Sequence, residues 1–441
     1  MSVTDRRGVA FSVGDDGSLE IYERALSAFN FYRGDPVAII DEALEVAPNF
    51  VMGEIFRGYM FVSSWEESAV VEVNTGLARL DVLVDGANER ERAHMAVLRD
   101  WSAGDWQGMR TRLDRILMEC PRDLLALQIG HLADFFMGDR DNLRGRIARA
   151  LPAWLEGEVG HGLALGMLAF GQEECGDYRR SEENAGRALN ANATDCWARH
   201  ALAHVMEMEG RQAEGAQFME ESAAHWAQED NTFAFHNWWH TALFHLDQGD
   251  VAKSLKLYDS SIHPGSEEAQ VTLLDSVSLL WRLHLGGEDV GARWQSVADC
   301  YEALGEAGFY AFNDMHAMMA YTAAGRRDAA EKHLAAVEKA AQKADANSEM
   351  ERCVGLPVLR ALAAFGRHDF AQCAEHLLPI RDRSHAFGGS HAQRDIIHRT
   401  LIEAALRSSD KALAETLSEE RLMLKPKCSY SLSLKERANM I

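Results

Sequence analysis

The sequence has few residues that terminate helices, since only 8 of its 441 residues are proline. It also has no run approaching the about 18 apolar residues that a membrane-spanning helix needs. The N-terminal segment lacks the apolar core of a secretory signal, and Asp15 and Asp16 stand where that core would lie. These absences predict a soluble, helix-rich protein without a membrane partner.

Paired cysteines and an excess of basic residues are missing as well. The seven cysteines form an odd set without a Cys-x-x-Cys pair, which is typical of reduced thiols in the cytoplasm. Lys and Arg number 45 against 68 Asp and Glu, so the net charge is −23. Such a charge repels phosphate backbones and anionic lipid, and it argues against nucleic-acid binding. The 47% of hydrophobic residues is enough for a large folded core.

Apolar residues recur at helical spacing from residue 18 to residue 422, and no alternating strand pattern interrupts them. Glycines punctuate this pattern at intervals of 34 to 41 residues, at Gly104, Gly138, Gly176, Gly210, Gly249, Gly287, Gly325 and Gly366, with Gly34 two periods earlier. A period near 34 is the signature of tetratricopeptide repeats, in which two helices meet at a turn. We therefore predict an all-α, right-handed superhelical solenoid of degenerate repeats over residues 18–424, with an N-terminal arm (1–17) and a C-terminal tail (425–441).

Several longer motifs resemble the tetratricopeptide repeat protein 38 family. They are the runs at residues 48–53 (PNFVMG), 200–208 (HALAHVMEM), 236–240 (HNWWH), 312–316 (FNDMH), 354–357 (VGLP) and 388–395 (GGSHAQRD). The resemblance covers roughly residues 18–428 and implies a helical repeat fold throughout, without a reaction to carry over. Met206 stands where that family has a further histidine.

The unusual polar residues precede the turn glycines, on the first helix of each repeat, which lines the concave face of such solenoids. Two His-x-x-x-His pairs, His200/His204 and His236/His240, each place both imidazoles on one helix face because i and i+4 lie about 40° apart. Glu207 shares the face of the first pair. Imidazole and carboxylate together suit Zn, Mn or Fe, so these four histidines are predicted metal ligands.

Two further interpretations of the four histidines stay open: acid–base catalysis without a metal, and buried histidines whose hydrogen bonds join adjacent repeats. The catalytic candidates are His204, Glu207, His240, Asp314 and His316. The substrate-binding candidates are His131, Asp134, Trp239, Asp275, Arg394 and Asp395. The three aspartates Asp275, Asp314 and Asp395 are also candidate helix caps, Asp395 above all because it follows Gly388-Gly389-Ser390.

This pattern predicts a small-molecule enzyme with hydrolytic or other acid–base chemistry on the concave face. The alternative is a non-catalytic scaffold that binds a peptide or protein partner in the same groove. An exposed terminal repeat would also permit a homodimer.

Overall fold

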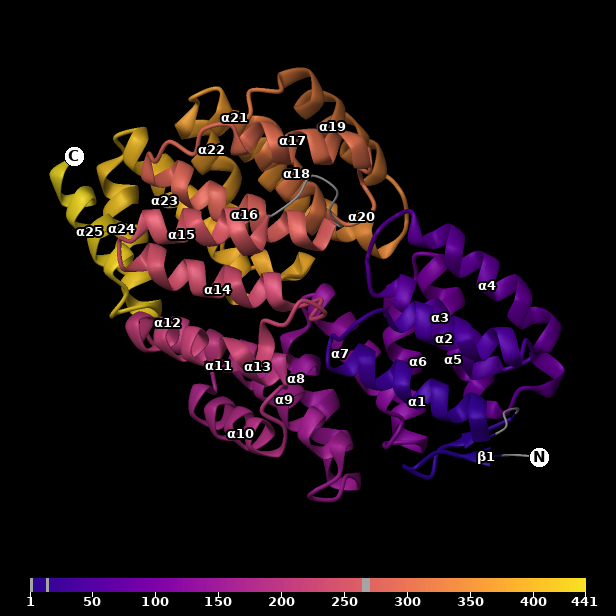
Figure 1. Ribbon diagram of the computed structural model, residues 1–441. Coiled ribbons are helices and arrows are strands. Elements are labelled where there is room, and N and C mark those ends of the chain that lie inside the picture. Colours follow the sequence, from indigo (N-terminus) through magenta and orange to yellow (C-terminus); the bar gives the residue numbers. More distant parts are fainter. Residues whose placement is uncertain (1–2, 13–15, 264–269) are drawn as a thin grey trace. The chain divides into compact units, whose positions relative to one another are not determined.

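The computed structural model describes residues 3–12, 16–263 and 270–441, and these residues are almost entirely helical (Figure 1). The chain divides into two compact units, Met1–Leu202 with His225–Phe233 and Ala203–Ala224 with Ala234–Ile441. Helices α11 (Cys196–Met208) and α13 (Ala223–Trp226) contain residues of both units. The all-α solenoid prediction is confirmed, whereas a single domain over residues 18–424 stays a prediction.

The first unit begins with a short antiparallel hairpin of β1 (Val3–Thr4) and β2 (Ala10–Phe11). Its helices are α1 (Asp16–Asn30), α2 (Pro36–Val46), α3 (Val51–Val62), α4 (Ala69–Leu83), α5 (Glu89–Ser102), α6 (Trp106–Glu119), α7 (Leu124–Phe136), α8 (Arg140–Ala150), α9 (Val159–Glu174) and α10 (Tyr178–Ala191). Short 3-10 turns follow α4 at Val84–Gly86 and α8 at Leu151–Ala153.

The second unit is likewise built of consecutive helices. Its helices are α12 (Gln212–Glu221), α14 (Ala234–Asp247), α15 (Val251–Leu257), α16 (Gln270–Gly286), α17 (Arg293–Leu304), α18 (Ala311–Ala323), α19 (Arg327–Ala340), α20 (Ala346–Met350), α21 (Leu356–Gly366), α22 (Phe370–Leu377), α23 (His391–Arg407), α24 (Lys411–Leu424) and α25 (Ser429–Met440). Single π-helical turns at Tyr258–Ile262 and Glu351–Gly355 extend α15 and α20, and 3-10 turns lie at Leu378–Ile380 and Ser384–Phe387.

An aspartate begins the outer helix of many repeats. Its carboxylate accepts a hydrogen bond from a backbone N–H three residues later, which satisfies one of the groups left unpaired at a helix start. This cap is present at Asp105, Asp139, Asp250, Asp369 and Asp410. Each such cap stabilises its helix by about 1 kcal/mol.

The turn between the paired helices needs a left-handed residue. The predicted turn glycines have positive φ at Gly34, Gly104, Gly138, Gly176, Gly210, Gly249, Gly287 and Gly325. Gly366 is different, because it ends α21 and its missing Cβ would lie 2.5 Å from Thr322 Cγ2 of α18. His368 takes the left-handed position of that turn with φ 61°, as Trp65 (52°) and Ser409 (59°) do in the turns after α3 and α23.

The first helix of most repeats is buried on nearly all sides, whereas the second buries a single stripe. Helices α7, α9, α16, α18 and α23 are of the first kind. Helix α10 buries only Ser181, Ala185 and Ala188. We call these first, mostly buried helices the inner helices and the second helices the outer helices. The polar residues predicted to line the concave face lie on inner helices.

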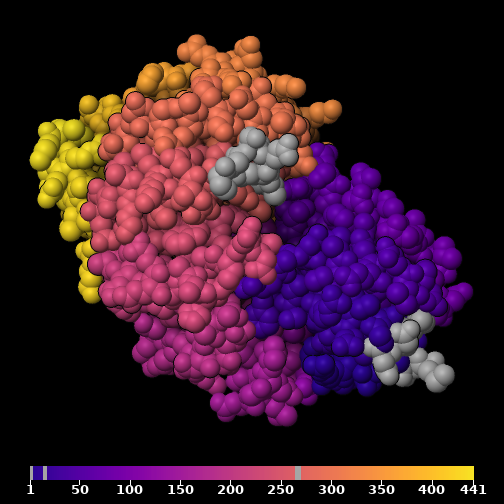
Figure 2. Space-filling model, in the orientation of Figure 1, coloured from indigo at the N-terminus to yellow at the C-terminus, as the bar shows by residue number. Residues whose placement is uncertain are grey.

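The last residues of the chain, predicted to be a tail, form helix α25, which buries Leu434 and Ala438. In Figure 2 the yellow end of the chain lies against earlier segments of the second unit. Among the described helices, none combines the length and the apolar content needed to cross a bilayer.

Candidate functional site

Three histidines meet inside the second unit: His204 on α11, and His236 and His240 on α14. All three side chains are buried, and each offers a ring nitrogen within 4.8 Å of those of the other two. The ring centroids of His204 and His240 are 4.4 Å apart, and those of His236 and His240 are 4.9 Å apart. Helical spacing puts His236 and His240 on one face of α14, and α11 supplies the third imidazole.

Two carboxylates and an indole orient these imidazoles. His236 Nδ1 lies 2.7 Å from Asp275 Oδ2 of α16, and His240 Nδ1 lies 3.6 Å from Glu207 Oε2 of α11. A carboxylate next to Nδ1 favours the tautomer with its proton on Nδ1 and its lone pair on Nε2. The ring of Trp239 stacks on that of His236, with the ring centroids 5.3 Å apart.

Burial decides the charge of the cluster. It lowers the pKa of His204 well below the usual value and that of His240 to about 4, so both rings are neutral at pH 7. Burial alone would raise the pKa of Glu207, but the ammonium of Lys425 and the neighbouring His240 outweigh it and hold that pKa well below the usual range. Glu207 is therefore a carboxylate whose counter-ion is a lysine, not a protonated histidine.

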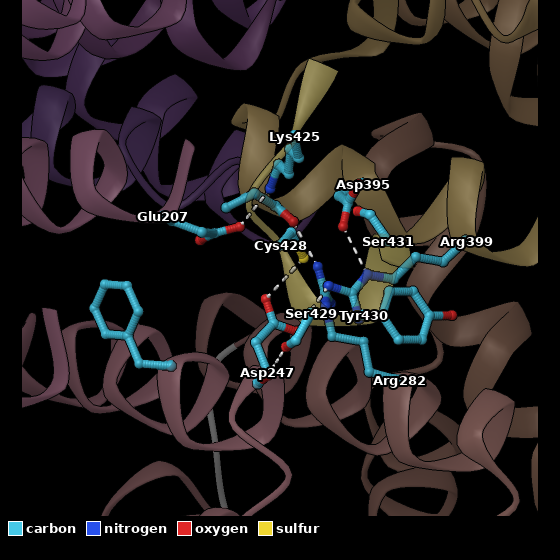
Figure 3. Close-up of polar contacts among 12 residues, drawn as sticks. Glu207, Asp247, Arg282, Asp395, Arg399, Lys425, Cys428, Ser429, Tyr430 and Ser431 are labelled. Carbon is cyan, nitrogen blue, oxygen red and sulfur yellow. Dashed lines mark hydrogen bonds and ion pairs between the residues drawn. The ribbon is translucent and has the colours of Figure 1, made fainter. Parts of the chain in front are cut away.

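Lys425 belongs to a stretch that we call the docked segment, residues 425–431, which includes the first turn of α25 and lies beside Glu207, Asp247 and Arg399 (Figure 3). Lys425 Nζ lies 3.0 Å from Glu207 Oε1, and both side chains are buried. Cys428 Sγ lies 3.8 Å from Asp247 Oδ2, and the Ser429 hydroxyl donates to the Asp247 carbonyl. The segment therefore meets acidic and carbonyl oxygens along its first half.

Guanidinium groups contact the second half of the docked segment. The Arg399 guanidinium lies 4.1 Å from the centre of the Tyr430 ring, and Arg421 Nε donates to Ser431 Oγ at 3.0 Å. Asp395 holds both arginines, at 2.6 Å from Arg421 Nη1 and 2.6 Å from Arg399 Nε. Burial alone would raise the pKa of Asp395, and these cations hold it well below its usual range.

Asp395 thus serves as an anchor for two arginines inside the protein. The helix cap expected of it is made instead by Ser390, which accepts from the Gln393 N–H and forms a capping box with that residue. Arg394, predicted to bind substrate, donates to the Gly389 carbonyl. Substrate roles for Arg394 and Asp395 stay predictions.

Asp314 and His316 lie on α18 but face different partners. The Asp314 carboxylate accepts the Gly308 N–H at 3.0 Å and lies 3.0 Å from His333 Nε2 of α19. His316 Nδ1 donates to the Phe312 carbonyl at 2.8 Å, and burial lowers its pKa to about 4. The histidine beside Asp314 is therefore His333, which sequence reasoning missed because it lies on an outer helix.

Three predicted residues belong to the first unit. Asp134 lies 2.7 Å from both Arg110 Nε and Arg146 Nε, in a buried ion triad. His131 contacts the rings of Phe170 and Trp197 at 6.0 and 5.5 Å, and burial lowers its pKa to about 3. His200 on α11 also packs on Phe170 and Trp197, at 5.0 Å from each. These surroundings resemble a packed core with internal ion pairs, and the ligand roles of the three residues stay predictions.

The first unit also contains a buried hydrogen-bond network that no sequence motif predicted. Tyr59 Oη lies 2.8 Å from His94 Nδ1, His94 Nε2 lies 3.0 Å from Asp123 Oδ2, and Arg90 Nη1 lies 2.6 Å from the same oxygen. Asp123 also caps α7 by accepting the Ala126 N–H. The hydrogen bonds of this network connect α3, α5 and α7.

Comparison with solved structures gives helical repeat proteins. The human IFIT1 dimer with m7Gppp-AAAA is 15% identical, with 98% of this chain and 96% of that chain covered and a TM-score of 0.42. Yeast Tom70 is 12% identical, with 96% and 88% covered and a TM-score of 0.38. The P58(IPK) TPR domain is 13% identical, with 90% and 98% covered and a TM-score of 0.20.

No protein-family model matches the chain. At these identities and TM-scores the likeness assigns the chain no family, and its all-α helical architecture is read from its own helices. What it binds has to be argued from its own residues.

Proposed function

We propose that this protein is a non-catalytic helical repeat scaffold, and that the inner surface of its second unit binds a short segment of a partner protein. The observation that carries the proposal is the docked segment, which occupies that surface through side chains distant in sequence. Lys425 and Glu207, 218 residues apart, form a buried ion pair. A surface that holds one such segment has the chemistry to hold another.

The contacts define the partner's chemistry. Glu207 pairs with an amine, and Asp247 contacts a thiol and a hydroxyl three and four residues after that amine in the bound segment. Arg399 contacts an aromatic ring one residue further on. The partner segment therefore carries Lys, a small polar pair and Tyr at the spacing Lys-x-x-Cys-Ser-Tyr of residues 425–430. The partner segment binds by replacing the docked segment. The tighter the docked segment binds to the inner surface, the higher the partner concentration needed to displace it.

The test uses a fluorescent peptide of residues 422–433 and the full-length protein. We expect saturable binding to the variants Lys425→Met and Tyr430→Ala, at least about tenfold tighter than to the wild type because their own segment competes less. A peptide with Glu in place of its Lys should not bind. Equal binding of both peptides, or no saturable binding to any of the three proteins, would reject the proposal.

A second candidate is the small-molecule enzyme with acid–base chemistry, and the short contact between His236 and Asp275 favours it. Such a pair orients the imidazole to act as a general base. In a screen of hydrolase substrates, Asp275→Asn should then lower kcat about 10²-fold or more with the helical circular dichroism unchanged. An equal rate in the variant would exclude His236 as that base.

Three finer points belong to this proposal. The motif resemblance supports membership of the tetratricopeptide repeat protein 38 family. The described cysteines form no disulfide, which is in keeping with the cytoplasm. Exposed apolar residues at the chain end, Met423, Leu424 and Met440, offer a surface for a homodimer.

A further inference from the structure

The cluster of His204, His236 and His240 has a composition that peptide recognition does not require. Buried polar residues in a repeat interior usually pair with one another, as Asp395 does with Arg421 and Arg399. Here three imidazoles face one another, with ring nitrogens within 4.8 Å. A neutral imidazole has one N–H and one acceptor nitrogen, so three such rings at this spacing can offer three nitrogen donors to one metal ion.

The spacing fits a single ion. Nitrogen ligands lie about 2.0–2.1 Å from Zn²⁺, so two ligands of one ion are at most about 4.2 Å apart. Small side-chain rotations bring nitrogens that lie within 4.8 Å of one another into that range. His236 and His240 project from one face of α14, and α11 provides His204, so two helices with regular geometry fix the set.

Carboxylates behind the ligands complete the arrangement. Metal-binding histidines usually donate the second ring N–H to a carboxylate, which fixes the tautomer and makes the ligand nitrogen more basic. Asp275 lies 2.7 Å from His236 Nδ1, and Glu207 lies 3.6 Å from His240 Nδ1. Both contacts are on Nδ1, which leaves Nε2 of each ring as the nitrogen that can bind a metal ion.

We propose that His204, His236 and His240 bind one borderline transition-metal ion, Zn²⁺ before others, through their imidazole nitrogens. Three imidazole ligands leave a fourth position for water or for a donor atom of a ligand. A site of nitrogen donors selects against Mg²⁺ and Ca²⁺, which require oxygen. Asp275 and Glu207 are positioning residues, and the site stands whether or not the second unit binds a partner segment.

The test is metal binding by the full-length protein. After equilibrium dialysis against Zn²⁺ we expect one equivalent per chain by elemental analysis, and Co²⁺ should give the intense visible bands of a tetrahedral site. His204→Ala and His240→Ala should lose the bound metal and these bands. His225→Ala, which removes an exposed histidine, should keep both.

A positioning variant guards against loss of folding in the histidine variants. Asp275→Asn keeps all three imidazoles, and we expect its Zn²⁺ affinity to fall about 10- to 100-fold with unchanged circular dichroism. A wild type that binds no stoichiometric Zn²⁺ or Co²⁺ would overturn the proposal. Unchanged Co²⁺ bands in folded His204→Ala or His240→Ala, or unchanged affinity in Asp275→Asn, would do so too.

Discussion

Lys425 and Glu207 illustrate what one side chain contributes to the interior of the second unit. The carboxylate is nearly fully buried beside neutral histidines, and the ammonium 3.0 Å away is the cation that stabilises its charge. Helical periodicity was sufficient to predict that Glu207 shares a face with His204. It gave no information about Lys425, because that pairing depends on how the chain folds across a sequence separation of 218 residues.

Removing this lysine should be costly. In Lys425→Met we expect the free energy of unfolding of the second unit to fall by about 3–5 kcal/mol, because Glu207 is left as a buried charge without its partner. Urea denaturation measures the loss. Lys427→Met, two residues later and exposed, is the matched control and should change stability by under about 0.5 kcal/mol. Equal losses of unfolding free energy in the two variants would mean that the buried ion pair does not stabilise the second unit.

His131 predicts a pH dependence for the first unit. Its pKa is about 3 in the folded protein, against about 6.5 for an unfolded histidine. Between these values the unfolded chain binds the extra proton, so stability falls as the pH drops below about 6.5, by about 2–3 kcal/mol at pH 4.5.

The measurement compares urea unfolding at pH 7 and pH 4.5. His131→Phe should show a smaller loss on acidification than the wild type, because it has no imidazole to protonate. His225→Phe, at an exposed position, should lose as much stability between pH 7 and pH 4.5 as the wild type does. If all three proteins lose the same stability, His131 is not the group responsible.

At the scale of helices, the sequence predicted most of what the structure contains. The glycine period located most of the turns, since a left-handed residue between paired helices is cheapest as glycine. Turns at Trp65, His368 and Ser409 gave no such signal, because there the surrounding helices hold a residue with a side chain at positive φ. Gly366 has a different role, as a contact point between α18 and α21.

Close helix packing makes a second class of glycine indispensable. A Cβ at Gly171 of α9 would lie 2.6 Å from Arg144 Cα and 2.8 Å from the Leu143 carbonyl oxygen of α8. The backbone of α8 cannot rotate away from a new methyl group as a side chain can. Gly171→Ala should therefore lower the free energy of unfolding of the first unit by about 3 kcal/mol. Gly186→Ala on α10, where a Cβ meets nothing within 4 Å, should stabilise it by up to about 1 kcal/mol. Urea denaturation of both variants checks the opposite signs.

At the scale of the whole molecule, the chain divides into two compact units, and a single repeat domain over residues 18–424 stays a prediction. The period of the glycines continues from one unit to the next, so nothing in it marks the division. Within the second unit, three buried acids pair with cations: Glu207 with Lys425, Asp247 with Arg399, and Asp395 with Arg421.

Compact units predict separate unfolding. In hydrogen–deuterium exchange over a urea series, Gly171→Ala should lower the midpoint for peptides of residues 16–190 and leave those of residues 270–441 in place. Lys425→Met should do the reverse. A single transition that both variants shift equally would show that the chain unfolds as one cooperative body.

The docked segment also has a consequence for synthesis of the protein. Ribosomes deliver the chain from its N-terminus, so the helix that carries Glu207 emerges more than two hundred residues before the cation that neutralises it. Until residues 425–431 have left the exit tunnel, the interior of the second unit holds an unmatched carboxylate and stays short of its native state. Nascent chains that end before this segment are therefore natural clients for chaperones, whereas the first unit can fold while translation continues.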